Sequence, residues 1–134
     1  MPSTWSEGVT GSALRVLLVE DDDENRELMA EVLTLAGCEV VTAASGHDGL
    51  RTLSETSVDV VVTDVGMPGM GGLEVARAAK AIAPTVPVVI VTGLADREGV
   101  SSARGKHVDA VLEKPVDAEA LAQTVFEVAR GRGR

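Results

Sequence analysis

A chain of 134 residues is long enough to fold as one domain, and because 45% of its residues are apolar but only 1% aromatic, its core must be aliphatic. The formal charge of −9 disfavours general binding to nucleic acid or to an anionic membrane, although it is compatible with a divalent cation. A single cysteine, Cys38, excludes an intramolecular disulfide, and the lack of a membrane-length apolar run or a signal pattern predicts a cytoplasmic protein.

The chain then alternates between two patterns. Residues 1–13 are small and polar without a period, so we expect a flexible leader. After them, short aliphatic runs alternate with stretches of helical periodicity; the first such stretch carries Leu28, Val32 and Leu35, and Gly37 is expected to end it in the left-handed conformation. The expected strands cover residues 14–19, 39–43, 58–63, 86–91 and 108–112, and the expected helices cover residues 25–36, 73–82 and 94–103, with two more capped by Ser45 and Asp117.

Five strands that alternate with five helices predict an α/β fold in which helices cover both faces of a parallel sheet. The first, third and fourth strands are almost wholly apolar, as burial on both faces requires. Because crossovers are right-handed, we expect a single doubly wound five-stranded sheet of order 2-1-3-4-5. One domain would cover residues 14–131, with a short tail at 132–134.

Polar residues follow the strands, at the edge where ligands bind to open parallel sheets. An acidic run at 20–24 follows the first strand, Asp64 the third, Thr92 the fourth and Lys114 the fifth. Oxygen ligands without His or Cys favour Mg²⁺, and a carboxylate held in such a site can attack phosphorus to give an aspartyl phosphate. Lys114 and Thr92 would then stabilise charge on the transferring oxygens.

Each of these residues also has an ordinary explanation. The acidic run suits the N-terminus of the helix that follows, and Asp64 could be a turn residue before a Gly/Pro loop. Thr92 could simply end a strand, and Lys114 could be a solvated cation. No such explanation predicts acid, acid, hydroxyl and lysine at four separate strand ends.

Four short motifs surround these residues. They are Val-Leu-Leu-Val-Glu-Asp-Asp at 16–22, Asp-Val-Gly-Met-Pro-Gly-Met-Gly-Gly at 64–72, Val-Ile-Val-Thr-Gly at 89–93 and Glu-Lys-Pro at 113–115. In this order and spacing they resemble the receiver domains of bacterial two-component response regulators, over residues 15 to about 130. The resemblance implies a flavodoxin-like fold in which Asp64 is the phosphoacceptor, Thr92 the switch hydroxyl and Lys114 the phosphate-binding lysine. It also implies a cis peptide bond between Lys114 and Pro115.

The acidic run allows two registers for the metal-binding pair of the family, Glu20 with Asp21 or Asp21 with Asp22. Glu20 and Asp21 are preferred because they follow the strand directly. This register also places Arg26 five residues after the second acid, where the family often has arginine. The resemblance then implies a Mg²⁺ site formed by Glu20, Asp21, Asp64 and the backbone carbonyl of Gly66.

The sequence departs from the family at Val111, and two further positions bear on the lifetime of a phosphorylated Asp64. Val111 stands where the family usually has Tyr or Phe, so the usual aromatic rotamer switch is absent. Gly66 and Leu94 occupy positions that influence water attack on the acyl phosphate, and neither side chain can hold a water by hydrogen bonding. We therefore expect slow self-dephosphorylation.

These observations predict a signalling module rather than a conventional enzyme. It would accept a phosphoryl group on Asp64 from a histidine kinase or histidine phosphotransfer protein, and catalyse its own phosphorylation and slow dephosphorylation. It would signal to a downstream protein, or by self-association, through the face formed by the fourth helix, fifth strand and fifth helix. The alternative is a pseudo-receiver that binds partners without phosphorylation. A phosphatase using an aspartyl phosphate is disfavoured, because Gly66 stands where a second Asp is needed.

Overall fold

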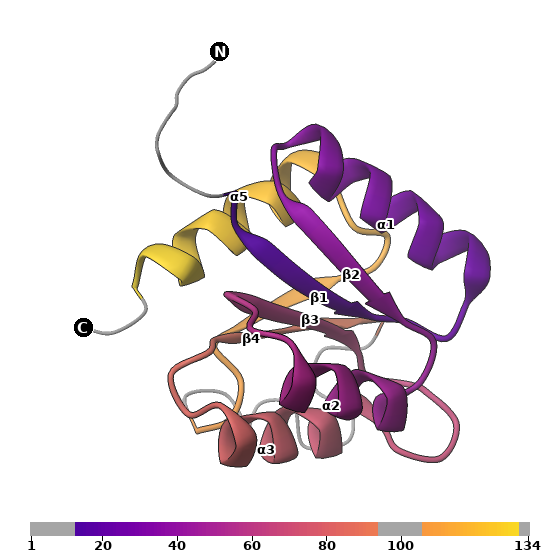
Figure 1. Cartoon of the computed structure of the whole chain (residues 1–134). Helices are drawn as coiled ribbons and strands as arrows, with labels where there is room; N and C mark the ends of the chain where they lie inside the picture. Colours follow the sequence, from indigo (N-terminus) through magenta and orange to yellow (C-terminus); the bar gives the residue numbers. More distant parts are fainter. Residues whose placement is uncertain (1–12, 94–105, 132–134) are drawn as a thin grey trace.

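The computed structural model describes residues 13–93 and 106–131, in which strands and helices alternate (Figure 1). The strands are β1 (Arg15–Val19), β2 (Glu39–Ala43), β3 (Val60–Asp64), β4 (Val88–Thr92) and β5 (Ala110–Glu113). The helices within the described residues are α1 (Asp23–Leu35), α2 (Gly46–Glu55), α3 (Gly72–Ile82) and α5 (Ala118–Arg130). The helix expected at 94–103 lies outside the described residues, as do residues 1–12 of the expected leader and the expected tail at 132–134.

The five strands form one parallel sheet in the order β2-β1-β3-β4-β5, which confirms the predicted doubly wound topology. Helices α1 and α5 cover one face of this sheet, while α2 and α3 cover the other (Figure 1). The core is correspondingly split into two aliphatic clusters, one on each face of the sheet. No helix among the described residues is long and apolar enough to cross a membrane.

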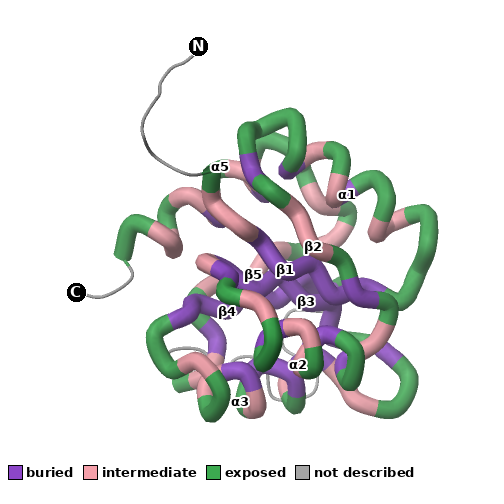
Figure 2. Tube along the Cα trace, in the orientation of Figure 1, coloured by how far each residue is buried: buried purple, intermediate pink, exposed green. Residues whose placement is uncertain are grey.

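Every residue of β3 and β4 is buried, as the central strands of a sheet covered on both faces must be (Figure 2). Both strands consist largely of β-branched residues, whose stiff side chains pack well on a pleated surface. Each buried Val or Ile side chain contributes about 1.5–3 kcal/mol relative to an exposed one, so these strands fix the position of the residues at their ends.

Two aspartates open strands in the same way and explain why β3 and β5 begin later than expected. The N–H of Asp109 donates to the carbonyl of Val88 at 2.8 Å, and its carboxylate accepts the N–H of Val88 at 2.8 Å. Asp59 makes the same pair of bonds with Arg15, each 2.8 Å long. Because the side chain takes a donor that a regular ladder would pair with the main chain, β3 starts at Val60 and β5 at Ala110 rather than at residues 58 and 108.

The apolar residues of α1 divide between the core and the surface. Leu28 and Leu35 are 59% and 82% exposed, whereas Met29 and Leu33 are buried against the sheet. The helix is rotated so that the i, i+4 pair of Met29 and Leu33 faces the core. It also begins at Asp23, two residues earlier than expected.

The predicted helix termini agree with the structure at three points. Gly37 follows α1 with φ of +102°, a conformation that residues with a side chain rarely adopt. Ser45 caps α2 by accepting the N–H of Asp48 at 3.1 Å. Asp117 caps α5 by accepting the N–H of Ala120 at 3.0 Å.

Candidate functional site

Three carboxylates meet where the central strands end. Glu20 follows β1, Asp21 is the next residue, and Asp64 is the last residue of β3. An oxygen of each lies within 4.8 Å of an oxygen of the others. Since β1 and β3 are adjacent and parallel, their carboxyl ends share one edge of the sheet, which is why residues far apart in sequence converge.

Glu20 is held by hydrogen bonds at a position where it is only 1% exposed. Its N–H donates to the carbonyl of Ala43 at 3.0 Å, and its Oε2 accepts the N–H of Asp22 at 3.1 Å. Its Oε1 is the one buried side-chain oxygen within the described residues that has no hydrogen-bond partner. Burial and the charge of Asp64 raise the pKa of Glu20, while the Asp22 N–H and Lys114 act in the opposite direction.

The carboxylates of the two possible acidic pairs make different contacts in the structure. Asp22 is the N-cap of α1, and its Oδ2 accepts the N–H of Asn25 at 2.8 Å. Its carboxylate is therefore engaged at the helix terminus, whereas the carboxylates of Glu20 and Asp21 are grouped with that of Asp64.

Lys114 brings an ammonium group to the carboxylates from the end of β5. Its Nζ lies 2.9 Å from Oδ1 of Asp64 and 3.8 Å from Oε1 of Glu20. Burial alone would lower the pKa of Lys114, but the hydrogen bond and negative charge of Asp64, with Glu20 and Asp21, raise it. The Lys114–Pro115 peptide bond is cis, as the resemblance implies.

Thr92 ends β4, the strand between those that carry Asp64 and Lys114. It is 2% exposed, and its carbonyl accepts the N–H of Lys114 at 2.9 Å. The register of β4 and β5 sets Thr92 opposite Glu113. Val111, where an aromatic residue is usual, is half-buried and packs against the core cluster on the α2 and α3 face.

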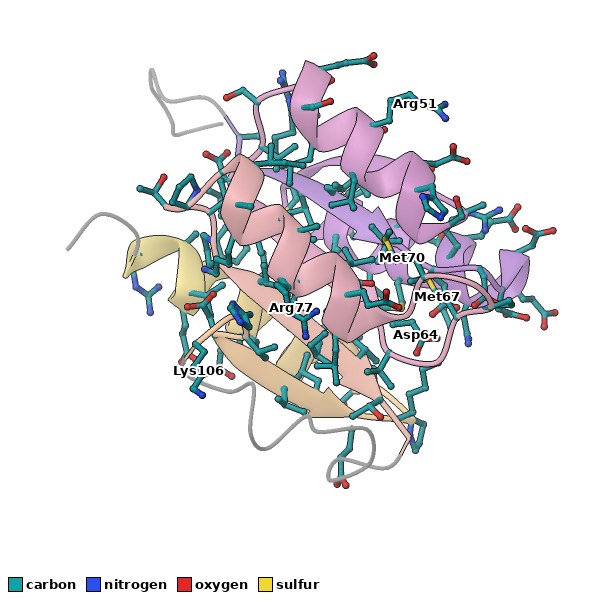
Figure 3. The ribbon with its side chains drawn as sticks, turned by 90° about the horizontal axis from the view of Figure 1, so that it is seen from below. Arg51, Asp64, Met67, Met70, Arg77 and Lys106 are labelled. Atoms are coloured by element: carbon teal, nitrogen blue, oxygen red, sulfur yellow. The ribbon has the colours of Figure 1, made fainter. Side chains whose placement is uncertain are left out.

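The loop from β3 to α3 lies at the end of the sheet that carries Asp64. In Figure 3 it carries Met67 and Met70 at the same end of the molecule as Asp64, and Met67 is buried. A Cβ on Gly72 would collide with the carbonyl oxygen of Asp64 and the Cα of Val65, so this close approach requires glycine. Gly66 is exposed on the same loop, with nothing within 4 Å of an added Cβ.

Two features of the site were not predicted from the sequence. Arg26 donates from Nη1 to the carbonyl of Glu20 at 2.8 Å, a contact with no local sequence signal. Beside Lys114, an apolar groove of about 520 Å³ runs between α1 and the start of α5, and Leu28, Val32 and Val116 help to line it. The helical spacing identified Leu28 and Val32 as apolar positions of α1 but did not indicate which of them would line a groove.

The donor set fits a hard divalent cation. All three clustered groups are carboxylates, and oxygen-only ligands suit Mg²⁺. The orphaned Oε1 of Glu20 is a buried acceptor that lacks a donor, and one ammonium cannot neutralise three carboxylates. A cation shared by these oxygens would satisfy the orphaned atom and reduce the repulsion.

Comparisons with known proteins agree on one family. The sequence model of the response regulator receiver domain matches residues 16–126. A cyclic di-GMP phosphodiesterase of Thermotoga maritima is 40% identical over 119 residues, covering 89% of this chain and 32% of that protein. The sensor histidine kinase RcsC of Salmonella typhi is 34% identical over 125 residues, covering 93% and 13%. The chain therefore spans about a third or less of these two relatives.

A comparison of this fold with solved structures also finds receiver domains. The crystal structure of a response regulator receiver domain protein from Clostridium thermocellum superposes with a TM-score of 0.83. That structure is 32% identical in sequence, and the match covers 88% of this chain and 95% of the other.

Proposed function

Because the chain belongs to the response regulator receiver family, we propose that it is a phosphoacceptor signalling module in which Asp64 takes a phosphoryl group. The observation that carries the proposal is the placement of Asp64. Asp64 is 7% exposed, and its carboxylate lies 2.9 Å from the Lys114 ammonium and is clustered with the carboxylates of Glu20 and Asp21. Such a constellation suits a carboxylate nucleophile whose charge is balanced by a cation and a lysine.

The transfer is a displacement at phosphorus. A carboxylate oxygen of Asp64 attacks the phosphorus atom, an O–P bond forms, and the P–N bond to the donor histidine breaks with its electron pair leaving on the nitrogen. Lys114, already bound to Asp64, moves its ammonium onto a phosphoryl oxygen, and the Thr92 hydroxyl donates a hydrogen bond to another. The backbone fixes both groups, because the Lys114 N–H is bound to the Thr92 carbonyl.

We assign the cation site to Glu20, Asp21 and Asp64, with the carbonyl of Gly66 as a further ligand. Mg²⁺ bound there would neutralise charge on the transferring phosphoryl oxygens. The arrangement of three carboxylate oxygens within 4.8 Å supports this assignment. Glu20, the most buried of the three residues, would contribute the acceptor that otherwise lacks a donor.

The phosphodonor in this proposal is a histidine kinase or a histidine phosphotransfer protein in the cytoplasm. The receiver domain would cover residues 14–131 and would signal through protein contacts rather than through nucleic acid or membrane binding. The face proposed for those contacts includes residues 94–105, which lie outside the described residues. That relatives include a sensor histidine kinase and a transcriptional regulator supports a role in phosphotransfer signalling.

The test is incubation with a small-molecule phosphodonor and Mg²⁺, followed by intact-protein mass spectrometry. The wild-type chain is expected to gain the mass of one phosphoryl group, and Asp64→Asn to gain none. Asp59→Asn is a matched control, since Asp59 lies at the opposite end of β3 and should leave labelling intact. An unmodified wild-type protein would contradict the proposal.

Val111 favours a second candidate, a pseudo-receiver that binds partners without phosphorylation. The valine removes the aromatic side chain through which the family usually reports phosphorylation. The same labelling experiment separates the two functions, because a pseudo-receiver would show no labelling of Asp64.

A further inference from the structure

Arg26 connects the loop between β1 and α1 to the first turn of α1. Its Nη1 donates to the carbonyl oxygen of Glu20 at 2.8 Å, and its Nη2 binds the carboxylate of Asp23. The side chain is only 20% exposed. Its own N–H donates to the carbonyl of Asp22 at 2.9 Å, so the residue binds this short loop through both backbone and side chain.

That loop carries two of the three clustered carboxylates. Residues 20–24 are five consecutive acids, of which the last two lie in the first turn of α1, and their mutual repulsion opposes this close arrangement when no cation is bound. Glu20 is fixed at its N–H by Ala43, at its Oε2 by the N–H of Asp22 and at its carbonyl by Arg26. Among the described residues, the Arg26 guanidinium is therefore the one side-chain group that donates a hydrogen bond to the backbone of Glu20.

We propose that Arg26 is a positioning residue that fixes the Glu20–Asp21 backbone for cation binding. It acts through the Glu20 carbonyl without contacting the cation. The inference rests on the proposed function only in taking Glu20, Asp21 and Asp64 as the ligands of the cation. The fork of a guanidinium binds the carbonyl and the Asp23 carboxylate together, a geometry that a lysine cannot reproduce.

The proposal predicts a change in Mg²⁺ affinity opposite in direction to the change expected from charge alone. Removing the positive charge of Arg26 from the neighbourhood of three carboxylates should by itself strengthen the binding of Mg²⁺. If Arg26 positions the ligands, its loss should instead weaken Mg²⁺ binding, and a substitution that keeps the charge should weaken it as well. The variants Arg26→Gln and Arg26→Lys therefore separate the two effects.

The measurement is the Mg²⁺ dissociation constant by titration calorimetry on the full chain. Both variants are expected to bind Mg²⁺ about tenfold more weakly, the lower end of the range for groups that orient metal ligands. Arg51→Gln is the matched control: Arg51 also pairs with an aspartate three residues earlier on a helix, Asp48, but is 67% exposed and lies far from Asp64 in Figure 3. It should bind Mg²⁺ as the wild type does.

A second readout needs no metal. In Mg²⁺-free protein, amide hydrogen exchange at Glu20 and Asp22, whose N–H groups are hydrogen-bonded, should be faster in Arg26→Gln than in wild type or Arg51→Gln. If Arg26→Gln does not fold, Arg26→Lys carries the test alone. Tighter Mg²⁺ binding in Arg26→Gln with none lost in Arg26→Lys would overturn the proposal in favour of a charge effect.

Failure of this inference differs from failure of the proposed function. Phosphorylation of Asp64 with unchanged Mg²⁺ affinity in both Arg26 variants would overturn the role of Arg26 alone. Weakened Mg²⁺ binding in both variants without any phosphorylation of the wild type would support the role of Arg26 and contradict the phosphoacceptor.

Discussion

Gly66 follows Asp64 by two residues, is exposed, and leaves open space where a side chain would lie. Without a hydrogen-bonding side chain there, nothing at this position can orient a water toward an acyl phosphate on Asp64. We expect Gly66→Asn to hydrolyse its phosphoryl group faster, on the order of tenfold, the effect of one added hydrogen bond in the transition state. Loss of the phosphoryl mass with time measures the rate.

Gly66→Ala is the control for this prediction. It fills the same space without an amide, and it should leave the lifetime of the phosphoprotein close to that of the wild type. An Asn variant no faster than the Ala variant would count against a role of this position in hydrolysis. The second position expected to matter, Leu94, lies outside the described residues.

Cys38 is buried, and its burial raises the pKa of the thiol to about 11. Because only the thiolate is nucleophilic, the native protein near pH ~8 should react with iodoacetamide roughly 100-fold more slowly than the unfolded chain, before any steric protection. Mass spectrometry of native and urea-unfolded samples measures both rates. Equal rates would show that the thiol is accessible and ionised normally.

The same pKa shift has a consequence for stability. The thiol pKa is higher in the folded state than its ordinary value of 9.0, so the folded state holds the thiol proton more tightly than the unfolded chain does. The resulting contribution to the free energy of unfolding is fully present below pH 9.0 and is lost as the pH rises toward about 11. In Cys38→Ala this contribution is absent. The urea midpoint of the wild type should therefore fall more steeply than that of the variant over this pH window.

At the scale of elements, the junction of β3 with α3 depends on Gly72. An alanine Cβ there would strike main-chain atoms of Asp64 and Val65, which cannot rotate away as a side chain could. We expect Gly72→Ala to lower the free energy of unfolding by about 1–3 kcal/mol, as overpacking typically does, and to slow phosphorylation because the Asp64 backbone must shift. Urea unfolding and the labelling rate measure the two effects.

Gly66→Ala again serves as the comparison, since Gly66 lies on the loop that leads to Gly72 at the start of α3 but has nothing within 4 Å of an added Cβ. The Gly66 variant should unfold at nearly the wild-type urea concentration. Identical midpoints for the two alanine variants would show that the loop relaxes without cost.

The positions of helices and strands were predicted well where they depend on residues close in sequence, and less well where they depend on packing against other elements. The helix caps at Ser45 and Asp117 follow from the residues themselves, because a side-chain oxygen reaches an N–H only three residues away. Which face of α1 is buried depends on its rotation against the sheet, so the helical spacing alone did not show that Met29 and Leu33 are buried while Leu28 is exposed. The contact from Arg26 to the Glu20 carbonyl likewise depends on how α1 is placed against the sheet.

At the scale of the whole molecule, a chain with a formal charge of −9 concentrates three carboxylates at one edge of the sheet. A ligand that binds only the folded state stabilises it by mass action, and a cation at this edge also relieves repulsion. We expect Mg²⁺ to raise the thermal unfolding midpoint by more than NaCl at matched ionic strength. Differential scanning fluorimetry measures the shift.

Asp21→Asn tests whether that stabilisation belongs to the proposed site. Asp21 is exposed and is the clustered carboxylate whose loss should disturb the core least. Its variant should lose most of the Mg²⁺-specific shift and keep the response to NaCl. Equal shifts in the variant and the wild type would place the stabilising cation elsewhere on the acidic surface.

The sequence by itself determined the doubly wound sheet and the set of residues at its strand ends. Both follow from periodicity and from the rule that parallel strands end at one edge, so no contact needs to be known in advance. Tertiary structure decided which acids enter the cluster: Asp22 turns to cap α1, while Glu20 and Asp21 join Asp64. It alone placed Arg26 on the Glu20 carbonyl, because backbone acceptors carry no sequence signal and are paired only by the folded geometry.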